Sequence, residues 1–387
     1  MFKRSLLCLA IAVALVGCAG EDATAPIDVQ YGALLDLSGP GKTLGTTSRA
    51  ALGIALGDDP IAVEDTGLVP ANALAALQRL HAKGVKVVFG PQSSSELAAI
   101  KDYADANGIL LISMGSTASS LSLANDNVLR FCPPDTKEIE AVVAYLEDEG
   151  KTGIVPVWRN DVGNQGLVNQ LKTQFPAAGG TASAGFMYEP ATSDFGPAVA
   201  AATTQATELR GTLGNTVALY FGSFDEAAQL AAAFPTDDVP GQIAIGGDGM
   251  AKAQSFLEPG ATAARAFAAR NNLVAPTFGL DPAQQSIWGP LTNQIKNLAG
   301  DDPDAFALAA YDSAVIARRV IGAAAHGVGA FKEAVVAEAN TYVGATGSCR
   351  LDVNGDRAVA PFDFYGLNDT PAWVVRASYR NGTIIRP

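Results

Sequence analysis

The sequence predicts an α/β protein made of two lobes, each a doubly wound parallel sheet. Three observations support this fold class. From residue 29 onward, short apolar runs alternate with amphipathic stretches of helical length, which is the pattern of βαβ units. The same rhythm restarts after Asp126, which indicates a second sheet. The chain also has 387 residues, more than one hydrophobic core normally serves.

The first block contains strand-like runs that are separated by helix-like stretches and small-residue loops. The runs expected to form strands are Tyr31–Asp36, Ile61–Val63, Val85–Phe89 and Ile109–Ile112. Between them we expect helices, one ending near Gly57, one at Ala71–Ala82 and one after Ser95.

The second block repeats the pattern and is followed by a mainly helical return. Its expected strands are Val128–Phe131, Ile154–Trp158, Ala184–Tyr188, Val217–Phe221 and Ile243–Gly246. The expected helices are Thr136–Glu149, one from Val162, Pro197–Leu209, one from Asp225, Gln284–Leu298, Ala305–Ala325 and Phe331–Ala339. Asn354-Gly355 between two strand-like runs then predicts a hairpin. The chain is therefore expected to pass between the lobes more than once.

The composition excludes several classes of protein. Lys and Arg number 26 against 39 Asp and Glu, which gives a formal charge of −13 at pH 7. A nucleic-acid binder needs clustered cations to displace counterions from phosphate, so no nucleic-acid partner is expected. A basic patch for anionic lipid is likewise not indicated. Hydrophobic residues make up 48% of the chain, enough for a large core.

The first 17 residues have the features of an export signal. Met1-Phe2-Lys3-Arg4 is basic, and Ser5–Gly17 is a mostly apolar run too short to cross a bilayer of about 30 Å. The run ends in Leu-Val-Gly-Cys18, which resembles the lipobox of bacterial lipoproteins. That resemblance implies a lipid on Cys18, a polar tether over residues 18–28, and a membrane-anchored protein that faces the periplasm or the cell exterior. The alternative is a plain signal peptide in which Cys18 has no role.

The sequence lacks the motifs with which most enzymes position their catalytic residues or metal ions. His81 and His326 each precede a glycine at the end of a helical run, where a cation complements the helix C-terminus. No Gly-x-Ser-x-Gly elbow and no paired Cys-x-x-Cys spacing occurs. We therefore expect no catalysis, no metal and no cofactor.

Two ligand-like motifs have simpler interpretations. Gly39-Pro-Gly-Lys-Thr43 follows a strand, but Asp36 holds the place where a phosphate loop needs a glycine, and its carboxylate repels phosphate. Asp352-Val-Asn-Gly-Asp356 has its glycine at the fourth place rather than the sixth of a calcium loop. A hairpin turn is the better interpretation of the second motif.

The loops at the predicted strand ends indicate a binding site for a zwitterion. In the first block they are rich in hydroxyl groups, at Ser93–Ser95 and Ser113–Thr117, and they precede helix N-termini that favour an anion. The alternative is that most of these serines are only N-caps. In the second block, Phe224-Asp225 and Asp248 follow strands and offer an acid for an ammonium group. Ligands of open parallel sheets bind at these strand ends, so the two lobes would form an amino-acid clamp.

The same residues resemble the periplasmic solute-binding proteins of the Leu/Ile/Val-binding type (type I periplasmic binding proteins). The likeness covers nearly the whole chain after the signal, and its most specific part is the strand and turn at 108–117. The resemblance implies two lobes joined by a three-strand hinge. The matching segments are Leu35–Pro40, Phe89–Ser95, Gly108–Thr117, Val128–Phe131, Tyr311-Asp312 and Gly347–Asp356.

The resemblance also assigns roles to individual residues. Ser94 and Thr117 would hold the ligand carboxylate, with help from the backbone of Gly115 and Ser116. Asp248 stands where the family keeps an acid for the α-ammonium group.

The resemblance places three further residues around the ligand side chain. Phe224 and Val162 stand at second-lobe positions that are rich in aromatic residues. Val162 has no tyrosine ring, and Leu44 takes a position that is often aromatic. These departures leave the ligand's side chain open.

The resemblance divides the chain into segments and gives the two remaining cysteines a location. Residues 29–130 and 279–346 would form lobe 1, and residues 131–278 and 347–387 would form lobe 2. Once Cys8 leaves with the signal and Cys18 is lipidated, Cys132 and Cys349 stay. A bond between them would join the crossover strands within lobe 2. The alternative is a pair of buried free thiols.

These predictions together describe a lipid-anchored solute-binding protein. It would capture an amino acid or similar small zwitterion by lobe closure and deliver it to an ABC permease. The alternative is a ligand-sensing regulatory lipoprotein of the same fold that acts on a partner protein.

Overall fold

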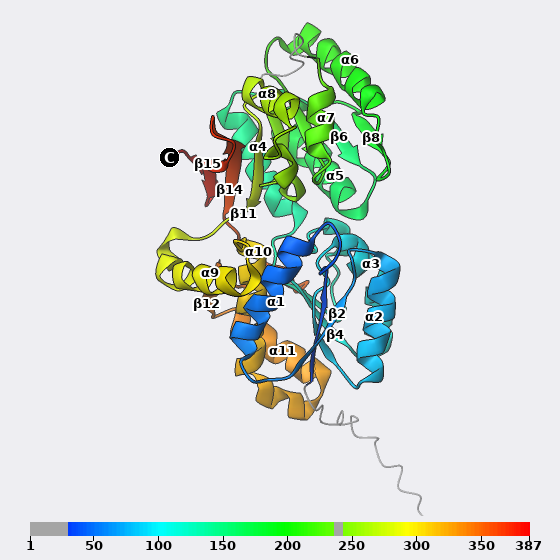
Figure 1. The fold of residues 1–387 in the computed structure, drawn as a ribbon, viewed down its shortest axis with the longest axis vertical. Coiled ribbons are helices and arrows are strands. Elements are labelled where there is room, and N and C mark those ends of the chain that lie inside the picture. Colours follow the sequence, from blue (N-terminus) through cyan, green and yellow to red (C-terminus); the bar gives the residue numbers. More distant parts are fainter. Residues whose placement is uncertain (1–29, 236–242) are drawn as a thin grey trace, which may run out of the picture.

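The computed structural model describes residues 30–235 and 243–387, and it contains two lobes stacked end to end (Figure 1). The lower lobe is built on a five-stranded parallel sheet with the order β2-β1-β3-β4-β5. Its strands are β1 (Tyr31–Leu35), β2 (Ile61–Asp65), β3 (Val87–Phe89), β4 (Leu110–Ser113) and β5 (Val128–Arg130). The predicted signal and tether lie outside the described residues.

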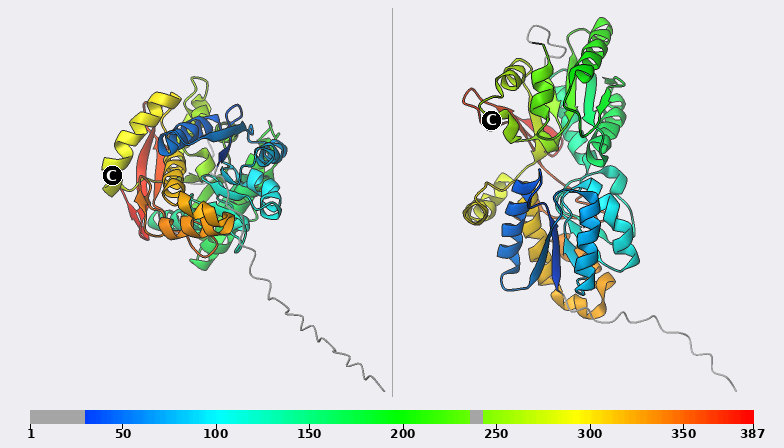
Figure 2. Two further views of the ribbon diagram at one scale, coloured as in Figure 1. Left: turned by 90° about the horizontal axis from the view of Figure 1, so that it is seen from below. Right: turned by 45° about the vertical axis from the view of Figure 1, so that its right-hand side comes forward.

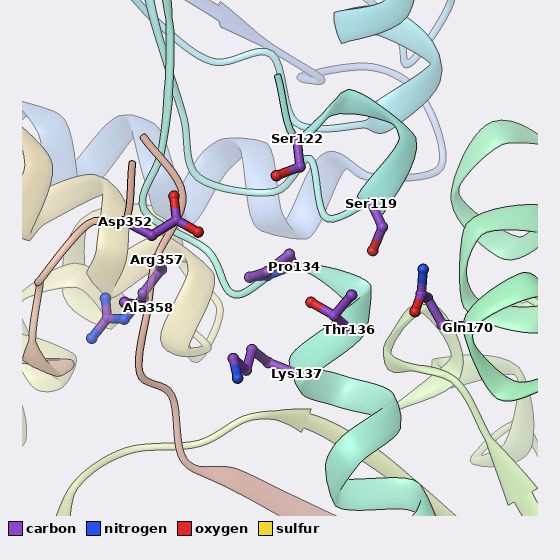
Figure 3. Close-up of a pocket in the computed structure, with 9 residues that line it drawn as sticks. All are labelled: Ser119, Ser122, Pro134, Thr136, Lys137, Gln170, Asp352, Arg357 and Ala358. Carbon is purple, nitrogen blue, oxygen red and sulfur yellow. The ribbon is translucent and has the colours of Figure 1, made fainter. Parts of the chain in front are cut away.

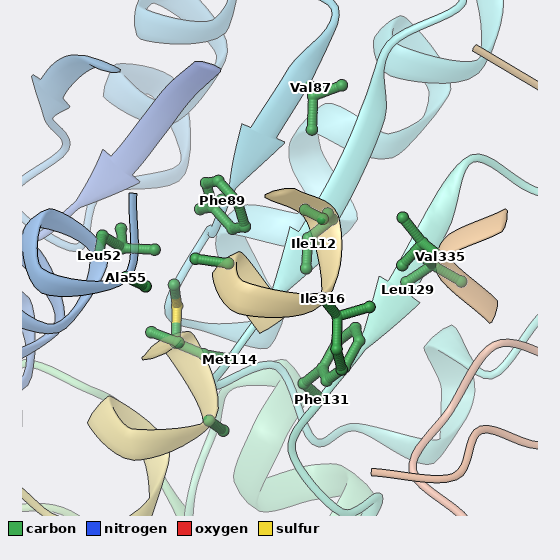
Figure 4. Close-up of a cluster of buried hydrophobic side chains, with 14 of the residues drawn as sticks. Leu52, Ala55, Val87, Phe89, Ile112, Met114, Leu129, Phe131, Ile316 and Val335 are labelled. Atoms are coloured by element: carbon green, nitrogen blue, oxygen red, sulfur yellow. The ribbon is translucent and has the colours of Figure 1, made fainter. Parts of the chain in front are cut away.

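Helices cover both faces of this first sheet, as the βαβ pattern requires. One face packs on α1, α10 and α11, where Leu52, Ile316 and Val335 meet strand residues such as Phe89 and Ile112 (Figure 4). The other face packs on α2 and α3. The bounds of these helices, together with α9 beside α1, are α1 (Lys42–Leu56), α2 (Pro70–Ala82), α3 (Ser94–Ala106), α9 (Gln285–Ala299), α10 (Ala305–Arg319) and α11 (Val328–Ala339).

The upper lobe is built on a mixed nine-stranded sheet. The order of its main path is β16-β15-β14-β11-β10-β9-β6-β7, and β8 also pairs with β6. Strands β6 to β11 run parallel, and the last three strands join antiparallel at one edge. The strands are β6 (Gly153–Arg159), β7 (Thr181–Ala182), β8 (Phe186–Tyr188), β9 (Val217–Gly222), β10 (Ala244–Gly246), β11 (Val274–Phe278), β14 (Phe362–Leu367), β15 (Trp373–Arg380) and β16 (Thr383–Ile385).

Two hydrophobic cores lie on the two faces of this second sheet. One core joins the sheet to α4 and α5, and the other joins it to α6, α7 and α8. The helices are α4 (Asp135–Asp148), α5 (Val162–Ala177), α6 (Gly196–Leu213), α7 (Ala227–Ala233) and α8 (Thr262–Arg270). Among the described residues, none of the helices combines the length and apolar character that crossing a membrane requires.

The predicted α/β fold class is confirmed, with differences in detail. The helix predicted over Ala305–Ala325 ends at Arg319, and a 3-10 helix over Ile321–His326 follows it. Strand β11 and the antiparallel strands β15 and β16 were not predicted. The Asn354-Gly355 turn does form, closed by a single antiparallel bridge between Leu351 and Arg357.

Three segments carry the chain between the lobes. The first runs from β5 to α4, the second from β11 to α9, and the third from β13 (Gly347–Ser348), which pairs with β12 (Val343–Gly344), to β14. Figure 2 shows the narrow connection that these segments make. The described structure therefore contains the three-strand hinge that the resemblance implies.

A buried ion pair ties the first crossover to the last. Arg130 Nε lies 2.5 Å from Asp356 Oδ1, and a second guanidinium nitrogen lies 2.6 Å from Oδ2. Both residues are buried, with 0% and 3% of their surface exposed. The third nitrogen donates to the carbonyl oxygens of Ser116 and Ala118, at 3.1 and 2.8 Å. One guanidinium group therefore holds both the hinge and the loop that follows β4.

The predicted disulfide is wrong, because both thiols are free and buried. Cys132 and Cys349 lie in the core of the first lobe rather than within the second. Cys132 Sγ donates to the carbonyl oxygen of Ser116 at 3.3 Å, and Cys349 Sγ lies 3.8 Å from Asp312 Oδ2. Burial raises the pKa of each thiol to about 12, so both stay protonated. Each cysteine thus has acceptors of its own, which corresponds to the alternative of buried thiols.

Replacing one member of the hinge pair is expected to destabilise the protein strongly. Arg130→Met leaves Asp356 as an uncompensated buried charge, which costs about 3–5 kcal/mol in the free energy of unfolding. The double variant Arg130→Met/Asp356→Leu should recover part of this loss, since no buried charge is left alone. Urea denaturation followed by circular dichroism measures both.

The matched control is the exposed pair Lys296–Asp302, at 2.8 Å. Lys296→Met should change the free energy of unfolding by less than about 1 kcal/mol. A loss for Arg130→Met no larger than that of Lys296→Met would show that the hinge pair contributes little.

Candidate ligand-binding site

Ser94 stands at the start of α3, at the edge of the first sheet that faces the second lobe. Ser93 and Glu96 form a capping box that fixes this helix start. Ser94 is 5% exposed, and its Oγ accepts hydrogen bonds from the Ala118 N–H at 3.1 Å and from the Ser116 hydroxyl at 3.4 Å. Since both contacts use its oxygen, the hydroxyl proton is left to donate to a ligand oxygen.

The loop after β4 is organised by Ser113. Its hydroxyl donates to the Pro91 carbonyl at 2.7 Å and accepts from the N–H groups of Gly115 and Ser116, at 3.4 and 3.0 Å. A methyl group on Gly115 would lie 2.4 Å from the Gln92 carbonyl oxygen, so only glycine fits this approach. The two backbone donors predicted to assist the ligand are thus directed at Ser113.

Thr117 connects the hydroxyl loop to the first helix of the second lobe. Its carbonyl accepts the Asp135 N–H at 2.8 Å, and its hydroxyl group lies near the Asp135 carboxyl group. Asp135 Oδ2 also accepts the Ser119 N–H at 3.2 Å. Asp135, the first residue of α4, therefore reaches across the first crossover to the predicted ligand loop.

Asp248 approaches the site from the second lobe. It begins a single 3-10 turn (Asp248–Met250) directly after β10, and it is half-buried. Its N–H donates to Glu138 Oε1 at 3.0 Å. The carboxyl groups of Asp135 and Glu138 both interact electrostatically with that of Asp248. The structure therefore brings Ser94, Ser116 and Thr117 of one lobe to the same region as Asp248 of the other.

The acids of this region have raised pKa values. Burial, and then the charge of Asp248, raises the pKa of Asp135 to about 7. Burial and the charges of Asp248 and Asp135 raise the pKa of Glu138 well above its usual value. Burial, with Asp304 and Asp161 nearby, raises the pKa of Asp248 to about 6. A ligand ammonium group beside these carboxyl groups would favour their ionised forms.

The three residues predicted to surround the ligand side chain lie on different elements, and only Phe224 adjoins the Asp248 turn. Phe224 is half-buried, with the Arg159 guanidinium carbon 5.3 Å from its ring centre, and a methyl group on Gly249 would touch its ring. Val162 belongs to α5 but packs on the first-lobe core around α2 and α3. Leu44 packs on the opposite face of the first sheet.

The two lobes meet closely at the starts of α3 and α5. A methyl group on Gly163 would lie 4.0 Å from the Ser94 Oγ, and one on Gly166 would lie 3.6 Å from the Ala118 Cα. Glycines at these two α5 positions therefore allow the helix to approach the ligand loop of the other lobe.

The two rejected motifs have structural roles. The Asp36 carboxylate accepts the N–H groups of Ser38, Gly39 and Gly41, at 3.2, 2.5 and 2.6 Å. It thus occupies the place that a phosphate would take. Asp352 Oδ1 accepts two N–H groups within its own turn, from Asn354 and Asp356. In the ranges that the structure describes, no group of three acids, histidines or cysteines could hold a metal ion.

A cavity of about 500 Å³ lies beside the first and last crossovers (Figure 3). Its walls come from both lobes and from the hinge, and none of the predicted ligand residues lines it. The lining residues are Ser119, Ser122, Pro134, Thr136, Lys137, Gln170, Asp352, Arg357 and Ala358. Because the two lobes share the walls, the shape of this cavity depends on how the lobes are oriented.

The family model for periplasmic binding proteins matches residues 28–370. The chain belongs to the periplasmic binding protein family. This is a family of solute-binding proteins rather than enzymes, and it is extracytoplasmic.

Three known proteins illustrate the likeness. An uncharacterized protein of Methanocaldococcus jannaschii is 26% identical over 308 residues, covering 74% of this chain and 70% of the relative. The leucine-binding protein LivK of Thermotoga maritima matches 91% of this chain and 99% of its own, with a TM-score of 0.72 and 18% identity. LivJ of Streptococcus pneumoniae, a branched-chain amino acid transporter substrate-binding protein in complex with isoleucine, matches 93% of this chain and 99% of its own (TM-score 0.70, 18% identity).

The sequence reasoning missed several acids of this periplasmic binding protein. Asp135 and Glu138 were given no role in the predicted site, whereas both are buried there. The sequence feature that could have identified them is the occurrence of two acids soon after the strand that leads into the first crossover. Asp161 and Asp304 were not considered at all, because each acts at this site only through the folding of distant segments.

Asp135→Asn is expected to stabilise the ligand-free protein more at high pH than at low pH. A carboxyl group whose pKa is raised on folding binds its proton more tightly in the folded state, so stability falls as pH rises from about 4 to about 7. The amide removes this penalty, and a tenfold difference in proton affinity between the folded and unfolded states corresponds to about 1.4 kcal/mol. Urea unfolding of both proteins at pH 5, 6.5 and 8 measures the difference.

The control for the titration is Asp102→Asn, since the Asp102 side chain is 86% exposed. As an exposed substitution, it should change the free energy of unfolding by no more than about 0.5 kcal/mol at any of these pH values. If the difference between Asp135→Asn and the wild type stays constant, then Asp135 does not titrate differently in the folded state.

Gly166→Ala is expected to destabilise the protein although alanine favours helices. The new methyl group would lie 2.2 Å from Asp135 Oδ2, so the buried carboxyl group must move. The cost of such overpacking, about 1–3 kcal/mol, exceeds the gain in helix propensity of about 1 kcal/mol. Gly211→Ala in α6 is the control, because its methyl group would meet nothing within 4 Å and should stabilise slightly. Equal stabilisation by both changes, measured by thermal unfolding, would exclude the close approach.

Proposed function

We propose that this protein captures an amino acid or similar small zwitterion between its lobes and delivers it to an ABC permease. The observation that carries this proposal is the meeting of neutral hydroxyl donors on one lobe with a carboxyl group on the other. Ser94 and Thr117 would receive the carboxylate, and Asp248 would receive the ammonium group. The N–H groups of Gly115 and Ser116 would instead hold the loop in place through Ser113.

Several further findings support an amino acid as the ligand class. The hydroxyl side offers hydrogen bonds rather than a free positive charge, because the nearby Arg130 guanidinium is paired with Asp356 and donates to backbone carbonyls. The N-terminus of α3 adds a partial positive charge at Ser94. The structural relatives are a leucine-binding protein and a protein bound to isoleucine. The Phe224 ring packs against Gly249, the residue that follows Asp248, and would cover the bound ligand.

We further propose that the mature protein is held on the outer side of a membrane by a lipid on Cys18. The support is the sequence alone, a basic start, a short apolar run and the Leu-Val-Gly-Cys18 ending. Lobe closure would occur about the three crossovers, with residues 29–130 and 279–346 moving against 131–278 and 347–387.

A thermal-shift screen of the described domain with the twenty L-amino acids is expected to identify at least one ligand. A ligand at 100 times its Kd raises the free energy of unfolding by about 2.7 kcal/mol. Asp248→Asn should then weaken that ligand by about tenfold or more, since a hydrogen bond to a charged group contributes about 1.5–3 kcal/mol. Isothermal titration calorimetry gives the two affinities.

Glu208→Gln, which changes an exposed acid on α6 of the same lobe, should leave the affinity unchanged. The amino-acid proposal fails if no L-amino acid raises the melting temperature. It also fails if Asp248→Asn binds the identified amino acid as tightly as the wild type.

A further inference from the structure

We propose that Glu138 is a positioning residue, which holds Asp248 toward the ligand by accepting its backbone N–H. The role of Asp248 rests on the proposed function, whereas the contact itself does not. Glu138 lies in the first turn of α4, 110 residues before Asp248 in the sequence, and the two belong to different elements of the second lobe.

The geometry leaves Asp248 dependent on this contact. Glu138 is 2% exposed, and its Oε1 lies 3.0 Å from the Asp248 nitrogen. The turn that Asp248 begins is only three residues long, and its own hydrogen bond from the Ala251 N–H reaches the Asp248 carbonyl, which leaves the Asp248 N–H to Glu138. On the N-terminal side, the Gly247 N–H donates to the Phe221 carbonyl at 2.9 Å. Glu138 supplies the next anchor along the chain, at Asp248 itself.

The contact between Glu138 and the Asp248 N–H is closely packed on the side of Gly247 and Tyr220. A methyl group on Gly247 would lie 3.0 Å from the Tyr220 Oη and 3.6 Å from Glu138 Oε1. Tyr220 is fully buried on β9. The Tyr220 hydroxyl group and the Glu138 carboxyl group both lie close to Gly247, which leaves room for them because it has no side chain. From this place Glu138 reaches the Asp248 N–H.

The chemical state of Glu138 suits an acceptor rather than a charge. The groups that face it are Asp135 on α4, Asp248 after β10 and Tyr220 on β9, and both acids oppose its ionisation. Burial is the largest cause and raises its pKa further, and a carboxyl oxygen accepts the N–H in either protonation state. Glutamine has the same carbonyl oxygen in nearly the same shape, whereas leucine has the volume without the acceptor.

The test compares Glu138→Gln and Glu138→Leu with the wild type. The probes are the L-amino acid that gives the largest thermal shift and the same molecule without its amino group, each measured by isothermal titration calorimetry. Glu138→Gln should bind the amino acid within about threefold of the wild type. Glu138→Leu should bind it about tenfold more weakly, which corresponds to the loss of about 1.4 kcal/mol, while the affinity for the analogue changes less than threefold. A purely structural role would weaken both probes together.

A second measurement needs no ligand. Hydrogen–deuterium exchange of the Asp248 amide should be equally slow in the wild type and Glu138→Gln, and about tenfold faster in Glu138→Leu. Glu147→Leu, at an exposed position in the same helix, serves as the control for both measurements. If no amino acid binds the wild type, the proposed function fails, and the exchange measurement still decides the role of Glu138. The positioning role is overturned if Glu138→Leu leaves the amide exchange unchanged, or if Glu138→Gln weakens the amino acid as much as Glu138→Leu does.

Discussion

The ion pair between Arg130 and Asp356 is the constraint on which the arrangement of this protein depends. It joins residues that are 226 positions apart, at the points where the chain first leaves the first lobe and last returns to the second. The same guanidinium group also binds the carbonyl oxygens of Ser116 and Ala118. The hinge and the loop that presents Ser116 and Thr117 are therefore held by one side chain, which fixes the ligand loop relative to the axis about which the lobes would move.

Around this anchor, the two lobes present groups of different chemistry to each other. The first lobe presents neutral hydroxyl groups at a helix N-terminus, and the second presents carboxyl groups that are buried beside one another. The carboxyl groups are costly alone, because they repel one another and lose their hydration on burial. The proposed zwitterion would relieve this cost through its ammonium group, which would favour closure on the ligand. The glycines at 163 and 166 of α5 let the lobes come close enough for this to happen.

Much of the fold and part of the site could be predicted from the sequence. The parallel strands of both sheets follow from short apolar runs between amphipathic helices, and Asp36 was correctly recognised as incompatible with a phosphate loop. The pairing of the two cysteines, in contrast, was predicted wrongly. Their number and export signal suggested a bond, but the structure gives Cys132 the Ser116 carbonyl and Cys349 the neighbourhood of Asp312. Strand β11 and the edge strands β15 and β16 were missed, because their registers depend on neighbours from other parts of the chain.

The sequence by itself determined the order of strands and helices, the two-lobe α/β class and the hydroxyl-rich loops, because local periodicity and turn composition set these features. Only the tertiary structure decided which polar groups are buried and what each contacts. Asp135 and Glu138 illustrate the difference, since in the sequence they are ordinary acids in the first turn of a helix. Their burial against Asp248, and the change in their pKa values that follows, arises from segments more than 100 residues apart. Local sequence carries no record of such contacts.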